Sequence, residues 1–388
     1  MDILVASGSF KDVYDPIEAC EVIRGALNPF NNQITVQPIC DGGEYTYDIL
    51  KETKEFTEVY VDSVYNAYLK PVRGYYLTDG RNAHIVSSEL IRLFPEEDSY
   101  KNPLKLSDYG LGQLVRHAIQ KGHSRITLYI GGTSTAAGGM GFAQALGARL
   151  FNKAGCEIKK PVTGEDLVNI SRIEKGEVDY SRIHFQVVAD GDAKCYEMSG
   201  ITALKVSNRY AAKRALIVQE LDHGIEHIQK LTGILPDASF TGAAGGLRFG
   251  IDQIFQAEYV LGGTYFADLF SLREKLKAVD LVLTGEGRFD NTACGKAPAY
   301  VAELSRRYQK PVWFICGQLA KESFESYKGG IVDGSSEKTL KELGISKLLT
   351  CQEFYDQNPL SENYLENIEI FREKTPVILR ALFEKEGL

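Results

Sequence analysis

Short, uninterrupted apolar runs near both ends of the chain predict the strands of a parallel sheet. Two such runs, Asp2–Ser7 and Ile34–Cys40, flank a segment with helical spacing, Ile17–Leu27. Far downstream, the apolar runs Ala278–Leu283 and Val312–Cys316 again flank a helical segment. Continuous apolar strands that alternate with helices are typical of a parallel sheet covered on both faces. We therefore expect the two ends of the chain to form one α/β domain.

The middle of the chain has a different pattern. Alternating stretches at 59–61, 73–77 and 84–86 predict a meander of strands. Helical and apolar segments then alternate, with helices expected at 111–121, 142–151 and 210–231 and strands at 126–130 and 185–189. The simplest division is a discontinuous domain, residues 1–68 with 277–388, around an inserted α/β domain, residues 69–276.

Composition restricts the class of protein further. The chain has 388 residues and a net charge of −8, which disfavours nucleic acid as a partner because phosphate binding needs a basic surface. It has neither a signal-peptide pattern at the start nor a run of roughly 20 apolar residues that would span a membrane. Seven scattered cysteines without a C-x-x-C pair indicate reduced thiols, hence a cytoplasmic protein. The sequence does not determine the oligomeric state, and a homodimer is one option.

Five predicted loops share one design, in which glycines with acids or hydroxyl groups follow an apolar strand: Ser7–Lys11, Asp41–Glu44, Gly131–Gly139, Ala189–Asp192 and Thr284–Asp290. Ligands of open α/β sheets bind at the carboxyl ends of strands, where such loops converge. Glycines let backbone N–H groups approach an anion, and a following helix start adds a favourable dipole. One such loop is usually only a turn, but five predict a shared ligand site.

The charged residues of these loops suggest roles in that site. Lys11 and Arg288 have the charge to hold a phosphate or a carboxylate. Four acids offer the oxygen ligands that Mg²⁺ prefers, or a base for a substrate proton: Asp190, Asp192, Glu286 and Asp290. Acids at strand ends also cap helices and turns, so a structural role is an equal alternative for each of them.

The common nucleotide-binding fingerprints are missing from the sequence. The Gly295-Lys296 pair lacks the first glycine of a Walker A loop, which would fall at Asp290, and an alanine follows the lysine. No G-x-G-x-x-G opens a helix after the first strand. A nucleotide site therefore has to be argued from other motifs.

Taken in order, the motifs resemble those of the type I glycerate kinase family. That family's P-D-S-F-K-G loop corresponds to residues 7–12, its D-G-G-E-G-T to 41–46, and its I-G-G-S-A-T-N-D-G-G to 130–139. Downstream, G-A-A-G-G-L matches 242–247, and T-G-E-G-R-x-D followed by G-K-A-P matches 284–298. The matches run in order from residue 1 to about 318.

The resemblance implies an α/β fold with two domains, one a flavodoxin-like parallel-sheet domain and the other an inserted restriction-endonuclease-like α/β domain. It also implies ATP, Mg²⁺ and transfer of the γ-phosphoryl group to a hydroxyl of a small hydroxy acid in a cleft between the domains. The catalytic residues would be Lys11, Asp190 and Asp290, and the metal ligands Asp190, Asp192 and Glu286. Acceptor binding would involve Ser9, Asp41, Gly42, Gly43, Glu44 and Arg288. Phosphate binding would involve Gly131, Gly132, Thr133, Ser134, Thr135, Gly138, Gly245, Gly246 and Lys296.

Several positions inside these motifs depart from the family pattern. Gly8 replaces an aspartate, Ala136-Ala137 replace Asn-Asp, and the family's I-E-M-A strand is Ile85-Val86-Ser87-Ser88. The segment Ala189–Cys195 keeps the first acid of C-D-V-x-N-P-L but loses the asparagine. Polar groups in a closed site pair with substrate or metal, so losing them costs transition-state stabilisation. Two explanations stay open: an altered, less polar or larger hydroxy acid, or a pseudokinase that binds a ligand or partner. An enzyme that no longer uses ATP is a third.

Overall fold

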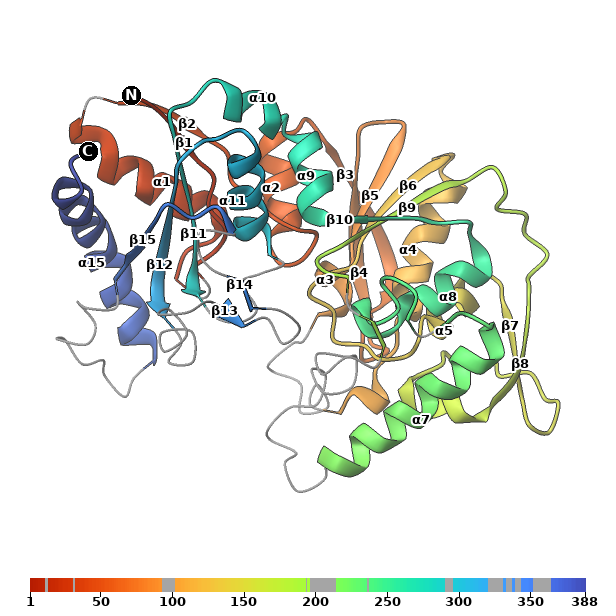
Figure 1. The fold of residues 1–388 in the computed structure, drawn as a ribbon. Helices are drawn as coiled ribbons and strands as arrows, with labels where there is room; N and C mark the ends of the chain where they lie inside the picture. Colours follow the sequence, from red (N-terminus) through yellow and green to blue (C-terminus); the bar gives the residue numbers. More distant parts are fainter. Residues whose placement is uncertain are drawn as a thin grey trace. The chain divides into compact units, whose positions relative to one another are not determined.

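The chain forms two compact units in the computed structural model, which describes residues 1–10, 13–30, 32–92, 102–192, 194–195, 214–235, 237–289, 296–319, 331–332, 337–338, 343–351 and 364–388. Unit 1 comprises Met1–Asp41 and Gly262–Leu388, and unit 2 comprises Gly42–Leu261. The colours of Figure 1 show that unit 1 is built from both ends of the chain. None of the helices in these ranges is long and apolar enough to cross a membrane.

This division differs from the predicted one at both boundaries. Residues 42–68 belong to unit 2, because β3 (Thr57–Tyr65) pairs along its length with β4 (Pro71–Thr78). Residues 262–276 belong to unit 1, because Ala267, Leu272 and Leu276 pack into that unit's apolar core. Strand pairing and core packing between distant residues thus set the boundaries.

Unit 1 is built on a five-stranded parallel sheet. In chain order its strands are β1 (Asp2–Val5), β2 (Gln33–Val36), β11 (Leu281–Phe289), β12 (Val312–Leu319) and β15 (Lys347–Thr350). They lie in the order β15-β12-β11-β1-β2. Numbered along the unit's own chain, that order is 2-1-3-4-5, which is the flavodoxin order. Strand order therefore confirms the flavodoxin-like prediction, with the topological switch point between β1 and β11.

Helices cover both faces of this sheet. On one face, α1 (Pro16–Leu27) and α15 (Tyr364–Lys385) pack against β1 residues such as Ile3. On the other face, α10 (Leu272–Lys277) and α11 (Ala297–Arg307) pack against Leu4 and Val282. The start of α1 is fixed by a capping box, in which Asp15 Oδ1 accepts from the N–H of Glu18 at 2.8 Å. The alternation of Ile3 and Leu4 between faces follows from the two-residue period of a strand.

β11 is longer than its sequence predicts. Residues 284–289 continue the strand and pair with β12, with Gly285 opposite Ile315 and Glu286 opposite Cys316. A Cβ atom at Gly285 would lie 2.1 Å from the Ile315 carbonyl oxygen, so the glycine allows a close approach of two backbones. The expected loop at 284–290 is therefore wrong for its described part, and this motif lies on a strand.

Unit 2 is built on a six-stranded mixed sheet, ordered β10-β9-β6-β5-β4-β3. The predicted meander is confirmed, since β3, β4 and β5 (Asn82–Val86) pair antiparallel. β5, β6 (Arg125–Tyr129), β9 (His184–Ala189) and β10 (Glu258–Leu261) pair parallel. The loops that follow β5, β6 and β9 therefore leave the sheet at the same edge.

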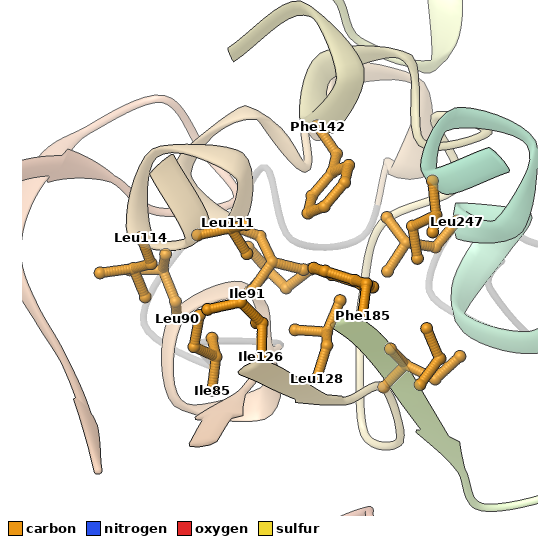
Figure 2. Close-up of a cluster of buried hydrophobic side chains, with 14 of the residues drawn as sticks. Ile85, Leu90, Ile91, Leu111, Leu114, Ile126, Leu128, Phe142, Phe185 and Leu247 are labelled. Carbon is orange, nitrogen blue, oxygen red and sulfur yellow. The ribbon is translucent and has the colours of Figure 1, made fainter. Parts of the chain in front are cut away.

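The helices of unit 2 pack on this sheet and on one another. Figure 2 shows their apolar side chains meeting those of the strands, with Leu90, Ile91, Leu111 and Phe142 around Ile126 and Leu128. The helices are α2 (Thr46–Thr53), α3 (Ser88–Ile91), α4 (Tyr109–Gln120), α5 (Met140–Ala145), α7 (Arg214–Thr232) and α8 (Leu247–Ile254).

The helix expected at 142–151 is wrong in its second half. α5 ends at Ala145, and Gly147 has a φ of 102°, which glycine adopts readily and which ends the helix. Arg149–Asn152 then forms β7, paired with β8 (Ile170–Glu174) in a separate antiparallel hairpin.

The remaining described elements are short. They are η1 (Asn28–Phe30), η3 (Pro103–Lys105), η4 (Gly164–Asn169), η6 (Ala243–Gly245), α9 (Gly262–Leu269), β13 (Ile331–Val332) and β14 (Glu337–Lys338).

Candidate functional site

The carboxyl edge of the unit 2 sheet brings together three of the predicted site segments. The N–H of Gly131, just after β6, donates to the carbonyl of Gly42 at 2.9 Å. A Cβ atom at Gly131 would lie 2.4 Å from Gly43 Cα and 2.9 Å from Asp190 Oδ2. Only glycine fits there, so the loops after β6 and β9 and the segment before α2 meet at one point. The exposed carboxylate of Asp190 lies at that junction.

The neighbouring residue, Gly132, extends this junction towards α3. Gly132 is exposed and has a φ of 69°, and a Cβ atom on it would lie 3.2 Å from Ser88 Cβ and 3.5 Å from Glu44 Cγ. Ser88 is buried, whereas Glu44 is exposed. We call Gly43, Glu44, Ser88, Gly132 and Asp190 the edge cluster. It contains two carboxylates and one hydroxyl on the rim of the sheet.

Several polar groups of the loop 131–139 form hydrogen bonds that stabilise the conformation of the loop itself. Both the N–H and the hydroxyl of Ser134 donate to the carbonyl of Ile91, at 2.9 and 2.8 Å. The N–H of Gly138 donates to the carbonyl of Gly245 at 3.1 Å. Together with the Gly131 bond, these contacts engage groups that the sequence assigned to phosphate binding. They fix the loop, in which Gly132 is exposed and Thr133 is half-buried.

Asp108 supports the far end of this loop, and the sequence analysis missed it. Its fully buried carboxylate accepts from the N–H of Gly139 at 3.0 Å and from that of Phe142 at 2.8 Å, at the start of α5. Burial raises the pKa of Asp108 from 3.8 to about 6, against the opposing effect of these hydrogen bonds. The Ser107-Asp108 pair before α4 was a visible cap signal, but the side chain caps a different helix.

The two alanines of the loop lie in the interior. Ala136 and Ala137 are both fully buried, and Ala136 belongs to an apolar cluster with Met140, Ile228 and Phe249. These positions therefore form core rather than a polar surface.

The second glycine loop, Gly245-Gly246, packs directly on the first. A Cβ atom at Gly245 would lie 1.9 Å from the carbonyl oxygen of Thr135, and its φ is 69°. A side chain at this position would separate the two loops. Thr135 Oγ1 is buried and has no hydrogen-bond partner within the described ranges, as is also true of Thr46 Oγ1 and Ser88 Oγ.

Asp192 is engaged in a turn instead of joining the edge cluster. Its carboxylate accepts from the N–H of Phe240 at 2.7 Å and from the hydroxyl of Ser239 at 3.1 Å. Phe240 has a φ of 63°, which these bonds stabilise. The structure thus gives Asp192 the alternative, structural role weighed for strand-end acids.

The switch point of unit 1 carries a separate set of predicted residues. The N–H of Gly8 donates to the carbonyl of Gly285 at 3.0 Å, and that of Gly287 donates to the carbonyl of Ser9 at 3.1 Å. Next to them, Lys296 Nζ lies 3.3 Å from Glu286 Oε2, whose side chain is 8% exposed. A carboxylate and an ammonium group thus stand where flavodoxin-like sheets bind their ligands.

Other predicted residues stand apart or are not described. Arg288 is exposed on β11, and Asp41 is half-buried at the end of the first segment of unit 1. Lys11 and Asp290 lie outside the described residues. In the part of the chain that the structure describes, no group of three His, Cys, Asp or Glu side chains could hold a metal ion.

Comparison with known proteins gives one consistent family. The family model described as "Glycerate kinase family" matches residues 3–340. The glycerate kinase of Bacillus subtilis is 31% identical over 341 residues, covering 85% of this chain and 88% of the relative. The glycerate kinase of Halalkalibacterium halodurans is 32% identical over 346 residues, covering 85% and 88%. The glycerate 2-kinase of Escherichia coli is 28% identical over 345 residues, covering 85% and 89%.

A solved structure has the same fold. It is a crystal structure of a candidate glycerate kinase 2 from Salmonella typhimurium LT2, with a TM-score of 0.73 and 24% sequence identity. The match covers 99% of this chain and 98% of that chain. Both units of the α/β fold therefore have a counterpart in a single known protein.

Proposed function

Because the chain belongs to the glycerate kinase family, we propose that it transfers the γ-phosphoryl group of ATP to a hydroxyl of a small hydroxy acid. The observation that carries this proposal is the exposed carboxylate of Asp190, held at the junction of Gly43 and Gly131. Phosphoryl transfer depends mainly on positioning and electrostatic stabilisation, and a fixed carboxylate can orient and deprotonate an acceptor hydroxyl.

Within unit 2, Asp190 would accept the proton of the acceptor hydroxyl or hold Mg²⁺. Mg²⁺ is usually bound by one or two carboxylates together with the phosphates of the nucleotide, so Asp190 suits it without a larger protein cluster. When bound, Mg²⁺ neutralises charge on the transferring group. The polar groups of Gly132, Thr133 and Thr135 would contact phosphate oxygens.

Within unit 1, the switch-point residues would supply positive charge. Lys296 would bind a phosphate oxygen, and Glu286, at 3.3 Å, would orient its ammonium group. Ser9 and Arg288 would contribute to acceptor binding, together with Lys11.

A coupled assay that measures ADP release with each member of a panel of small hydroxy acids tests the proposal. We expect Asp190→Asn to lower kcat/KM by about 100-fold or more, the usual effect of a lost general base. Asp192→Asn is the matched control, because that carboxylate is engaged by Ser239 and Phe240. If Asp190→Asn kept full activity on each accepted substrate, the role of Asp190 would be refuted.

A second candidate, a pseudokinase that binds a ligand or partner, is favoured by one observation. The position of the family's asparagine is Ala136, which is packed among apolar side chains. Thermal stabilisation by Mg²⁺-ATP without ADP release on any acceptor would support this candidate. No stabilisation by ATP at all would count against both functions and favour an enzyme that does not use ATP.

A further inference from the structure

A surface cavity of unit 2 lies next to β7 and β8, which pair as an antiparallel hairpin (Figure 1). Its volume is about 510 Å³, which is within the range of small-molecule sites in proteins. It is lined by residues of the segment 152–160, together with Asp166 and Asn169. None of these residues belongs to the edge cluster, so the cavity is distinct from the site described above.

Hydrogen bonds fix the backbone that surrounds this cavity. In the second half of the segment, Gln144 Nε2 of α5 donates to the carbonyls of Ile158 and Lys160, at 2.7 and 2.9 Å. In its first half, Asn152 Oδ1 accepts from the N–H of Ala154 at 3.0 Å. The backbone that carries the lining residues is thus held in place by the protein itself, and a ligand that binds here does not have to order it.

The carboxylates of the cavity already have cationic partners. Glu157 Oε2 lies 3.0 Å from Arg149 Nη2, and Asp166 Oδ1 lies 2.8 Å from Lys160 Nζ. The other oxygen of Asp166 accepts from the N–H of Thr163 at 3.1 Å, which fixes this carboxylate further. The negative charge of the cavity is therefore balanced within the protein.

Two lysines of the cavity are left over after this pairing. Lys153 and Lys159 are exposed, and neither forms a salt bridge with a residue in the described ranges. The chain as a whole carries a net charge of −8, so this cavity differs in sign from the average of the molecule. Two positive charges on one cavity attract an anion, and they attract a dianion most strongly.

Charge and size together favour a phosphate monoester as the ligand. Such a group carries about −1.5 to −2 charges at pH 7, whereas a carboxylate carries one, and lysine binds phosphate as a point charge. Inorganic phosphate would leave most of the cavity unfilled. An organic group attached to the phosphate can instead contact Ala154 and the half-buried Ile158.

We propose that this cavity binds a small phosphate monoester, with the phosphate group held by Lys153 and Lys159 and the organic group against Ile158. This site goes beyond the proposed function and does not depend on it, because none of the residues given a role in phosphoryl transfer lines the cavity.

Calorimetry on the full chain with phenyl phosphate and glycerol 3-phosphate tests this inference. Phenyl phosphate should bind about tenfold or more tightly than benzoate, which has the same ring and one charge, and than inorganic phosphate, which has no organic group. Lys153→Ala and Lys159→Ala should each weaken binding about three- to tenfold, and together about 30-fold, since each removes a charge-assisted hydrogen bond. Lys175→Ala is the matched control, because this exposed lysine follows β8 but does not line the cavity.

Two further variants locate the bound phosphate. Replacing both Lys153 and Lys159 by arginine keeps their charges and should retain most of the affinity. Lys296→Ala should leave the affinity unchanged, because Lys296 belongs to the switch point of unit 1.

Three results would overturn the inference. The first is full affinity in the double alanine variant, or loss of affinity in Lys296→Ala, since either would mean that the ligand binds elsewhere. The second is equal affinity for inorganic phosphate and phenyl phosphate, which would mean an adventitious ion only. The third is failure of both monoesters to bind. Each of these results leaves the kinase proposal standing, because ADP release is measured separately.

Discussion

Replacing Asp108 by asparagine should remove a specific part of the pH dependence of stability. The carboxylate is fully buried, and its pKa is raised from 3.8 to about 6. An acid with a raised pKa stabilises the folded state most at low pH, where the folded form holds its proton. That contribution is lost as the pH rises from about 4 through 6. Asparagine does not titrate, so the unfolding free energy of the variant does not contain this pH-dependent contribution.

The magnitude follows from linkage. The full difference of about two pKa units corresponds to about 3 kcal/mol of unfolding free energy, and about half of it falls between pH 5 and pH 8. The variant also loses one of the two hydrogen bonds at the start of α5, since its amide nitrogen cannot accept from an N–H. That loss lowers its stability at every pH, by about 1–3 kcal/mol.

Urea unfolding at pH 5, 6, 7 and 8 measures both effects. The gap in unfolding free energy between wild type and Asp108→Asn should narrow with rising pH, by about 1–2 kcal/mol over this range. Taking the difference between the two proteins cancels the titration of all other groups. Parallel pH profiles would show that the Asp108 carboxylate titrates as in the unfolded chain, and the reasoning would be refuted.

Three further substitutions follow from the same geometry. Gly131→Ala places a Cβ atom 2.4 Å from Gly43 Cα and should lower the unfolding free energy measured in urea by about 2–3 kcal/mol. Gly191→Ala is the control, because its added Cβ atom would have no neighbouring atom within 4 Å, and it should change that free energy by about 0.5 kcal/mol or less. Ala136→Asn should lower stability by about 2–4 kcal/mol, because it buries an amide in an apolar cluster; a change under about 0.5 kcal/mol would mean that the position is open to solvent or ligand. Gly25→Ala, inside α1 with open space around it, should raise the melting temperature, and a fall would contradict its assigned helical geometry.

Local patterns were enough to predict the architecture, because buried strands and capped helices are specified by nearby residues. The apolar runs that form β1, β2, β11 and β12 were predicted, and so was the helical segment that became α1. The order of the family motifs along the chain then implied a flavodoxin-like unit, and the observed strand order confirms it.

Features that depend on distant partners could not be predicted. Glycines at 285 and 287 suggested a turn, but Gly285 permits close contact with Ile315 on the next strand. Asp108 precedes α4, yet it binds N–H groups more than 30 residues away. That the Ser88 hydroxyl has no hydrogen-bond partner among the described residues is likewise a property of the packed structure. The roles assigned to Asp190, Glu286 and Lys296 remain predictions.

The strand order of the unit 1 sheet determines when this sheet can be completed during synthesis of the chain. Strand β1, which lies between β2 and β11, is made first, but its partner β11 comes much later in the chain, with Ile3 opposite Leu281. At about 5–20 residues per second, the ribosome needs tens of seconds to deliver that partner. Unit 2 is synthesised during this interval, and until β11 follows, the edge of β1 that pairs with β11 in the folded protein has no partner strand. Pairing between residues so far apart in the chain should make closure of the unit 1 sheet the slow step of folding.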